Sequence, residues 1–121
     1  MRVPVLKQGS YLIATSQSAL TDADWKQLQS ELAQLVGKHR STGVVVDVTS
    51  LDVLDSFAAR TLRAIASVLK LRGAETVIVG IQPDVAFTMV QLGLTLEAVS
   101  TALDLEDGLS ILRRRKQVRD A

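Results

Sequence analysis

The chain contains 121 residues, of which 47% are apolar and 3% aromatic, and its formal net charge is +1. This length suits one domain, expected to span residues 1–121, and the apolar fraction argues against disorder. The absence of cysteine excludes disulfides and thiolate metal sites, and the single histidine excludes a histidine cluster. Because no secretory signal and no apolar run of membrane-spanning length is visible, we expect a cytoplasmic protein that enters no membrane.

The first elements along the chain predict a β-hairpin. The apolar segments Val3–Leu6 and Tyr11–Thr15 flank a turn at Gln8-Gly9-Ser10. A turn this short permits only antiparallel pairing, so these strands should form an antiparallel edge of the sheet.

A helix and a buried strand are expected next. Thr21, followed three residues later by Asp24, predicts a capping box, and the apolar positions after it repeat with helical spacing. This helix should end near Arg40. The run Gly43–Val48 is apolar almost throughout, which is typical of a strand buried on both faces.

The rest of the chain alternates helices with strands, which predicts an α/β fold with a largely parallel sheet. We expect a mixed sheet of four or five strands with four helices. The remaining elements are a helix at 56–71 followed by Gly73, a strand at Thr76–Val79, a helix from Pro83 to Gly93, a short strand at Glu97–Thr101 and a helix capped by Asp104.

Residues 113–121 form a basic C-terminal tail. Its cations could meet nucleic acid or an anionic membrane, or they could end a solvated helix, where the dipole favours positive charge. The tail has no interleaved aromatic residues to stack on bases, so we expect the second role and no nucleic acid partner. Because it follows Leu112, the last apolar position of its helix, it should bury little.

The segment from Asp47 to Ala58 is the most informative part of the sequence. It leaves a buried strand, crosses a polar turn and opens a helix, which places the Ser56 hydroxyl in the first helical turn at the edge of the sheet. Unpaired backbone N–H groups and the helix dipole would tolerate a phosphate there. The pattern therefore suits a regulatory switch.

The segment also contains residue types that two kinds of catalytic site use. Asp47, Asp52 and Asp55 resemble the acids of a Mg²⁺-dependent phosphoacceptor domain, but the residues after the first strands lack the further acids that such a site needs. A Ser56 nucleophile would need a base, and His39, the only histidine, belongs to a helix-to-strand loop. We therefore expect no enzyme activity, no metal and no cofactor.

The runs at residues 44–57, 72–83 and 90–93 resemble the STAS domain, the fold of anti-sigma-factor antagonists, over essentially the whole chain. Within this family the sequence is most similar to the RsbS branch of stressosome proteins. That branch consists of single STAS domains with Leu-Thr-Asp before the first helix, here at residues 20–22, and Asp-Ser-Phe at the switch, here Asp55-Ser56-Phe57. The RsbR branch tends to have two phosphorylated threonines, at positions that are Ser56 and Val79 here, so one phosphosite carries over.

The resemblance implies a scaffold that sequesters an RsbT-type serine kinase within a stressosome shell and releases it when Ser56 is phosphorylated. The implied partners are the kinase, an RsbR-like STAS paralogue, a phosphatase that resets Ser56, and a second copy in a homodimer. Asp55, Ser56, Phe57 and Arg60 would form the partner-binding surface. A second possibility is a SpoIIAA-type antagonist, which switches partners without a shell.

Overall fold

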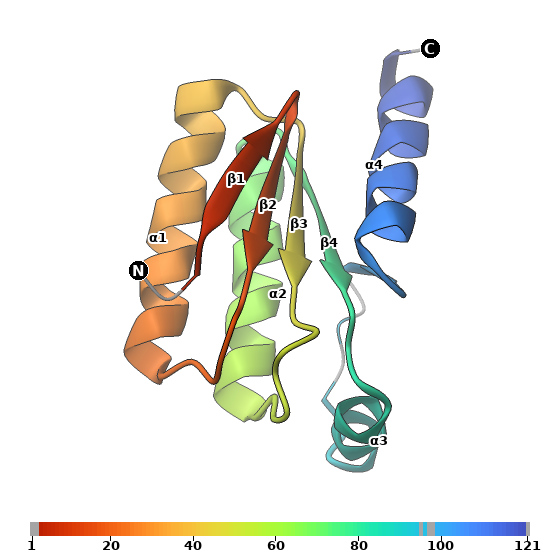
Figure 1. Cartoon of the computed structure of the whole chain (residues 1–121). Helices are drawn as coiled ribbons and strands as arrows, with labels where there is room; N and C mark the ends of the chain where they lie inside the picture. Colours follow the sequence, from red (N-terminus) through yellow and green to blue (C-terminus); the bar gives the residue numbers. More distant parts are fainter. Residues whose placement is uncertain (1–2, 95, 97–98, 121) are drawn as a thin grey trace.

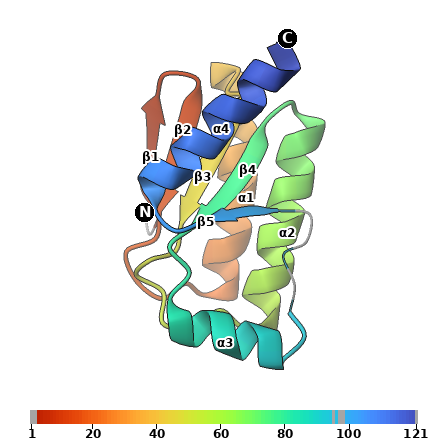
Figure 2. The ribbon, with the colours of Figure 1, turned by 90° about the vertical axis from the view of Figure 1, so that its right-hand side faces the viewer.

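The structure is a computed structural model that describes residues 3–94, 96 and 99–120. Within this part of the chain, five strands form one sheet in the order β1-β2-β3-β4-β5 (Figures 1 and 2). Strands β1 and β2 pair antiparallel, and all other neighbours pair parallel, which confirms the predicted mixed sheet and its antiparallel edge. The elements are β1 (Val5–Gln8), β2 (Tyr11–Thr15), α1 (Asp22–His39), β3 (Gly43–Asp47), α2 (Ser56–Leu71), β4 (Glu75–Val79), α3 (Pro83–Gln91), β5 (Ser100–Ala102) and α4 (Leu105–Asp120).

The helices cover the sheet unequally. Helices α1 and α2 pack against one face, α4 lies alone across the other, and α3 sits beyond the carboxyl ends of the parallel strands (Figures 1 and 2). Alternate residues of the central strands therefore point into two separate hydrophobic clusters. Val44 and Val46 face α1 and α2, whereas Val45 faces α4.

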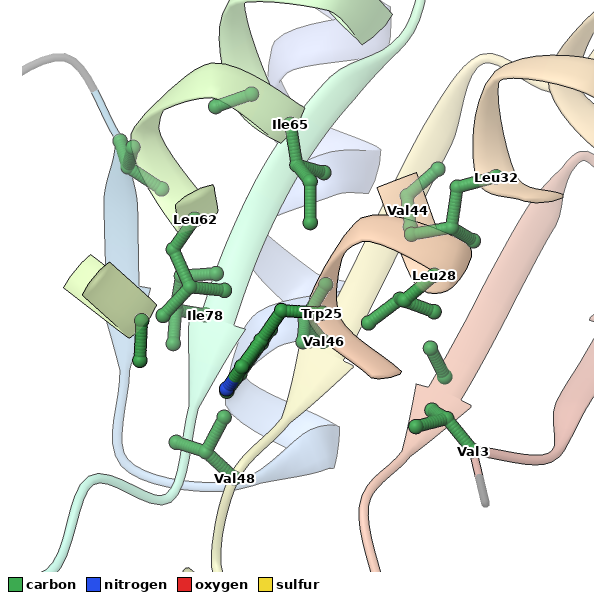
Figure 3. Packing of buried hydrophobic residues seen from close by; sticks show 14 of the residues in the cluster. Val3, Trp25, Leu28, Leu32, Val44, Val46, Val48, Leu62, Ile65 and Ile78 are labelled. Carbon is green, nitrogen blue, oxygen red and sulfur yellow. The ribbon is translucent and has the colours of Figure 1, made fainter. Parts of the chain in front are cut away.

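The larger cluster is built from aliphatic side chains around one tryptophan. Leu32, Leu62 and Ile78 are fully buried between the helices and the sheet. Figure 3 shows Trp25 of α1 lying beside Val46, with its indole nitrogen directed toward Val48. The aromatic ring thus fills the end of the core from which the chain leaves β3 and enters the loop before α2.

Sequence signals at the helix ends are confirmed. The Thr21 hydroxyl accepts from the Asp24 backbone N–H at 3.1 Å, and the Asp24 carboxylate accepts in return from the Thr21 N–H at 3.0 Å. Asp104 caps α4 by accepting from the Asp107 N–H at 2.9 Å. Gly73 follows the C-cap of α2 and has a positive φ of 91°.

Four strands differ from their predicted bounds, and for two of them the difference is one residue: β3 ends at Asp47 and β4 begins at Glu75. Strand β1 begins at Val5, after Pro4, and continues to Gln8, because the pairing of Gln8 with Tyr11 closes the hairpin with a two-residue turn. Strand β5 spans Ser100–Ala102, where its backbone pairs with β4. Of the expected strand Glu97–Thr101, residues 97 and 98 lie outside the described residues.

The basic tail continues α4, which runs to Asp120. Leu109 and Leu112 are buried against the sheet, as the helical spacing predicted, whereas Arg113 and Arg114 are exposed. Arg115 contacts Glu75 at the start of β4, with 3.5 Å between guanidinium and carboxylate. In the described part of the chain, no helix is long and apolar enough to cross a membrane.

Candidate functional site at the start of helix α2

The loop from β3 to α2 is held at its beginning by Asp47. One carboxylate oxygen of Asp47 accepts hydrogen bonds from the Thr49 backbone N–H at 2.9 Å and the Thr49 hydroxyl at 2.6 Å. The Val48 N–H donates to the Val79 carbonyl at 3.0 Å, which extends the β3–β4 ladder by one residue. Asp47 is thus engaged in a local turn, as Asp residues often are after strands.

Buried leucines anchor the rest of this loop. Leu51 and Leu54 are both buried in the larger cluster, whereas Asp52 and Val53 between them point to solvent. Val53 is 74% exposed. The loop therefore has a rigid apolar underside and presents its tip outward.

Asp55 is the N-cap of α2. Its carboxylate accepts from the Ala58 N–H at 2.8 Å, and its backbone is extended, with φ −82° and ψ −178°. Ser56 is then the first helical residue and is exposed. In the part of the chain that the structure describes, the Ser56 hydroxyl has no hydrogen-bond partner, so it is available to an external group.

The other two predicted site residues lie around Ser56 in different environments. Arg60 is exposed and, four residues along α2, shares the helix face of Ser56. Phe57 is half-buried and packs against the larger cluster. The structure thus brings Asp55, Ser56 and Arg60 together on an accessible surface, while the Phe57 ring forms its apolar border.

Lys26 is a neighbour of this site that the sequence does not reveal. Its ammonium nitrogen lies 6.0 Å from the centroid of the Phe57 ring, at the outer limit of a cation–π contact. In the sequence Lys26 is one of several polar residues off the apolar face of α1. Only the packing of α1 beside α2 brings this cation close to the start of α2.

Helix α3 supports the same end of the molecule (Figure 1). Gln82, which precedes α3, donates from Nε2 to the Thr49 carbonyl at 2.6 Å and so joins the two strand-end loops. Phe87 and Val90 of α3 are exposed. Together with Val53 they add apolar surface to the end of the sheet that carries Ser56. The buried face of α3 is formed by Val85 and Met89, so apolar residues that lie off this face are the signal that points to the exposed pair.

A pocket of about 180 Å³ opens beside the N-cap. Its walls combine the cap residue with apolar side chains from the segments before α1 and before α2, which makes it a shallow hollow for a small side chain. It is lined by Ala19, Leu20, Trp25, Leu51, Val53, Asp55 and Ala58.

The fold does not bring together the residues that either catalytic alternative needs. His39 ends α1 and precedes β3, whereas Ser56 follows the opposite end of β3, so the two residues lie at different ends of the sheet. Among the described residues, no three His, Cys, Asp or Glu side chains form a group that could hold a metal ion. The arrangement around Ser56 is that of an accessible hydroxyl at a helix start.

The chain is similar in sequence and in fold to several known proteins. The STAS domain family matches residues 2–108. Among curated proteins, the RsbT co-antagonist protein RsbRA of Bacillus subtilis is 34% identical over 84 residues, which make up 69% of this chain and 31% of that protein. The chain therefore spans about a third of the length of this relative.

Two solved structures resemble the whole chain. A serine-to-glutamate variant of RsbS from Moorella thermoacetica has a TM-score of 0.82 and 33% identity, covering 97% of this chain and 99% of that one. A chain from a structure of the molecular architecture of the stressosome has a TM-score of 0.74 and 32% identity, covering 93% and 98%.

Proposed function

We propose that this chain, which belongs to the STAS domain family, is an RsbS-type scaffold and phospho-switch without catalytic activity of its own. Unphosphorylated, it holds an RsbT-like serine kinase within an assembly that also contains an RsbR-like STAS paralogue. Phosphorylation of Ser56 releases the kinase, and a phosphatase resets the serine. The similarity to RsbS and to a stressosome chain over more than nine-tenths of this chain supports the assignment.

The observation that carries the proposal is the state of the Ser56 hydroxyl. It is exposed at the first position of α2, and no contact among the described residues competes with a kinase for it. Two nearby threonine hydroxyls are less suitable as acceptors. Thr61 is only 7% exposed, and the Thr49 hydroxyl already donates to Asp47.

The effect of the phosphate follows from its charge. A phosphoserine carries about −1.5 to −2 charges at neutral pH. The helix dipole stabilises this charge at the start of α2, so the domain stays folded. Asp52 and Asp55 lie in the same surface, and the phosphate makes that surface strongly acidic. A partner whose own contact surface is acidic or apolar is then repelled, and about 1.4 kcal/mol of lost interface energy already weakens binding tenfold.

The proposal is tested by incubating the chain with an RsbT-like kinase and ATP and mapping the phosphopeptide. We expect acid-stable phosphate on Ser56, and kinase binding that falls as the phosphate is incorporated. The matched control is Ser50→Ala, which removes another exposed hydroxyl of the same loop and should change neither result. Phosphate mainly on Thr49, Ser50 or Thr61 would contradict the proposal, and an acid-labile phosphate would indicate an acyl phosphate on Asp47.

The SpoIIAA-type alternative differs in its assembly. Both functions use a phosphorylated serine, but the alternative needs no shell. Gel filtration of the chain with an RsbR-like paralogue separates them, because a megadalton peak indicates a stressosome shell. A mixture that remains at the mass of small complexes, while still binding a kinase, would favour direct partner switching.

A further inference from the structure

The outer face of α4 carries a continuous stripe of exposed side chains. Among the described residues, α4 is the only helix on its face of the sheet, and no other element covers its outer side (Figures 1 and 2). Leu109 and Leu112 point inward, so Asp107, Arg114 and Val118 fall on the opposite side of the helix. Leu103, in the turn just before the helix, is 82% exposed, and Val118 is 77% exposed.

The charges along α4 are separated by sign. The first turn and its cap are acidic, with Asp104, Glu106 and Asp107, whereas residues 113–116 are all basic. Two copies of such a helix attract each other when they lie antiparallel, because the acidic start of each then meets the basic end of the other. A parallel arrangement would place like charges together.

Residues of the stripe are also placed symmetrically about one point of α4, so that a two-fold axis at this point would pair them. Asp107 and Arg114 are equally distant from the midpoint between Ser110 and Ile111, and so are Leu103 and Val118. A two-fold axis through that midpoint would place Asp107 against Arg114 of the partner subunit, twice. It would also place Leu103 against Val118 of the partner subunit, twice, which covers the most exposed apolar side chains of this face.

The two charged residues are available for such contacts. Arg114 donates to the Ser110 hydroxyl at 3.1 Å, and Asp107 accepts from the Leu103 N–H at 3.3 Å. Neither residue takes part in an ion pair within the described part of the chain, unlike Arg115, which pairs with Glu75.

A hollow beside α4 gives an incoming apolar side chain a place to bind. Its volume is about 570 Å³, and it opens between the helix and the edge of the sheet at β5. Ile111 and Val118 supply its apolar wall. The two-fold register brings Leu103 of the partner subunit to Val118, at the mouth of this hollow. The other lining residues are Glu75, Ser100, Thr101, Arg114 and Arg115.

We propose that the outer face of α4 is a self-association surface on which a second copy of this chain lays its own α4 antiparallel, with reciprocal Asp107–Arg114 pairs. This surface specifies the homodimer that belongs to the proposed function. It lies on the opposite face of the sheet from α2, so it operates independently of the Ser56 switch.

Charge reversal tests the pairing by sedimentation velocity. The wild-type chain should form a dimer at high micromolar concentration, and the dimer should weaken at high salt. Asp107→Arg makes all four facing residues basic, and Arg114→Asp makes all four acidic, so each variant alone should dissociate at least about tenfold more readily. An equimolar mixture of the two variants restores opposite charges at both pairs and should form a heterodimer.

The mixture also controls for folding, because two misfolded chains would not restore a defined dimer. Arg113→Asp is the matched control, since it makes the same charge change at the next residue, about 100° around the helix. It should dimerise like the wild type. A monomeric wild type, single variants that dimerise normally, or a mixture that stays monomeric would each overturn the proposal. Kinase binding by the same variants, read separately, should be unchanged, so failure of the pairing would leave the Ser56 switch unaffected.

Discussion

Gln82 and Thr49, which are 33 residues apart in the sequence, are joined by a hydrogen bond of 2.6 Å from the Gln82 side-chain amide to the Thr49 carbonyl. Gln82 is the N-cap of α3, and Thr49 begins the loop that leads to Ser56. The loops that follow β3 and β4 are therefore connected just beyond the carboxyl ends of these two strands. This hydrogen bond links the loop before Ser56 to the start of α3, so a partner that contacts both would meet two connected segments.

Gly80 allows the Thr49 side chain to pack closely against the loop that follows β4. Gly80→Ala should therefore be strongly destabilising. Its φ is +80°, and an added Cβ would collide with the Thr49 hydroxyl and lie 3.2 Å from the Asp47 carboxylate. We expect the left-handed conformation and the collision together to cost roughly 2 kcal/mol or more of unfolding free energy. Urea denaturation measures this loss.

The control for that experiment is Gly73→Ala. Gly73 also has a positive φ, of +91°, but a Cβ there would meet nothing within 4 Å. It should lose only the conformational part, about 1 kcal/mol. Equal losses at the two positions would show that the contact with Thr49 is unimportant.

Asp55→Ala should weaken the start of α2 without unfolding the domain. It removes the acceptor of the 2.8 Å hydrogen bond from Ala58, and loss of an N-cap costs about 1 kcal/mol. Asp55→Asn keeps a capping oxygen and should retain most of the stability. Thermal unfolding compares the two variants, and an equal destabilisation by both would indicate that the charge of Asp55, rather than its cap, is what matters.

Ser56→Ala and Ser56→Asp should both fold, yet differ in kinase affinity. The hydroxyl has no described internal partner to lose, and an acid at a helix start is favourable by roughly 0.3–1 kcal/mol. Alanine should bind an RsbT-like kinase and resist release. Aspartate carries less charge than a phosphate, so it should bind more weakly than wild type but more tightly than the phosphorylated chain. Calorimetric titration gives the kinase affinities of the wild type, the two variants and the phosphorylated chain, and identical values would refute the switch.

Deleting residues 113–121 should separate the two proposed interactions, kinase binding and dimerisation. Leu109 and Leu112 remain to hold α4 on the sheet, and the lost Arg115–Glu75 pair is a surface contact worth at most about 1 kcal/mol. The truncated chain should therefore stay folded and bind the kinase, because Ser56 lies on the other side of the sheet. It should fail to dimerise, since Arg114 and Val118 are gone. Loss of kinase binding in a folded truncated chain would show that the tail belongs to the switch.

Much of the fold could be read from the sequence, because the signals that produced it are local. The hydroxyl of Thr21 and the carboxylate of Asp24 identify a helix start within one turn of chain. The nearly continuous apolar run at Gly43–Val48 indicates a strand covered on both faces, and the alternation of such strands with amphipathic helices predicts a parallel sheet. The exposure of Ser56 could be predicted for a similar reason, because this residue begins a helix just after a buried strand ends.

The tertiary structure alone decided the surroundings of that serine and the role of the last helix. Nothing near Lys26 in the sequence indicates that it lies over Phe57, and nothing near Gln82 indicates its bond to Thr49, because both contacts depend on how distant segments pack. The spacing of Leu109 and Leu112 predicted an apolar face for α4. Only the sheet, by burying that face and leaving the opposite side uncovered, made Asp107 and Arg114 into an outward-facing pair.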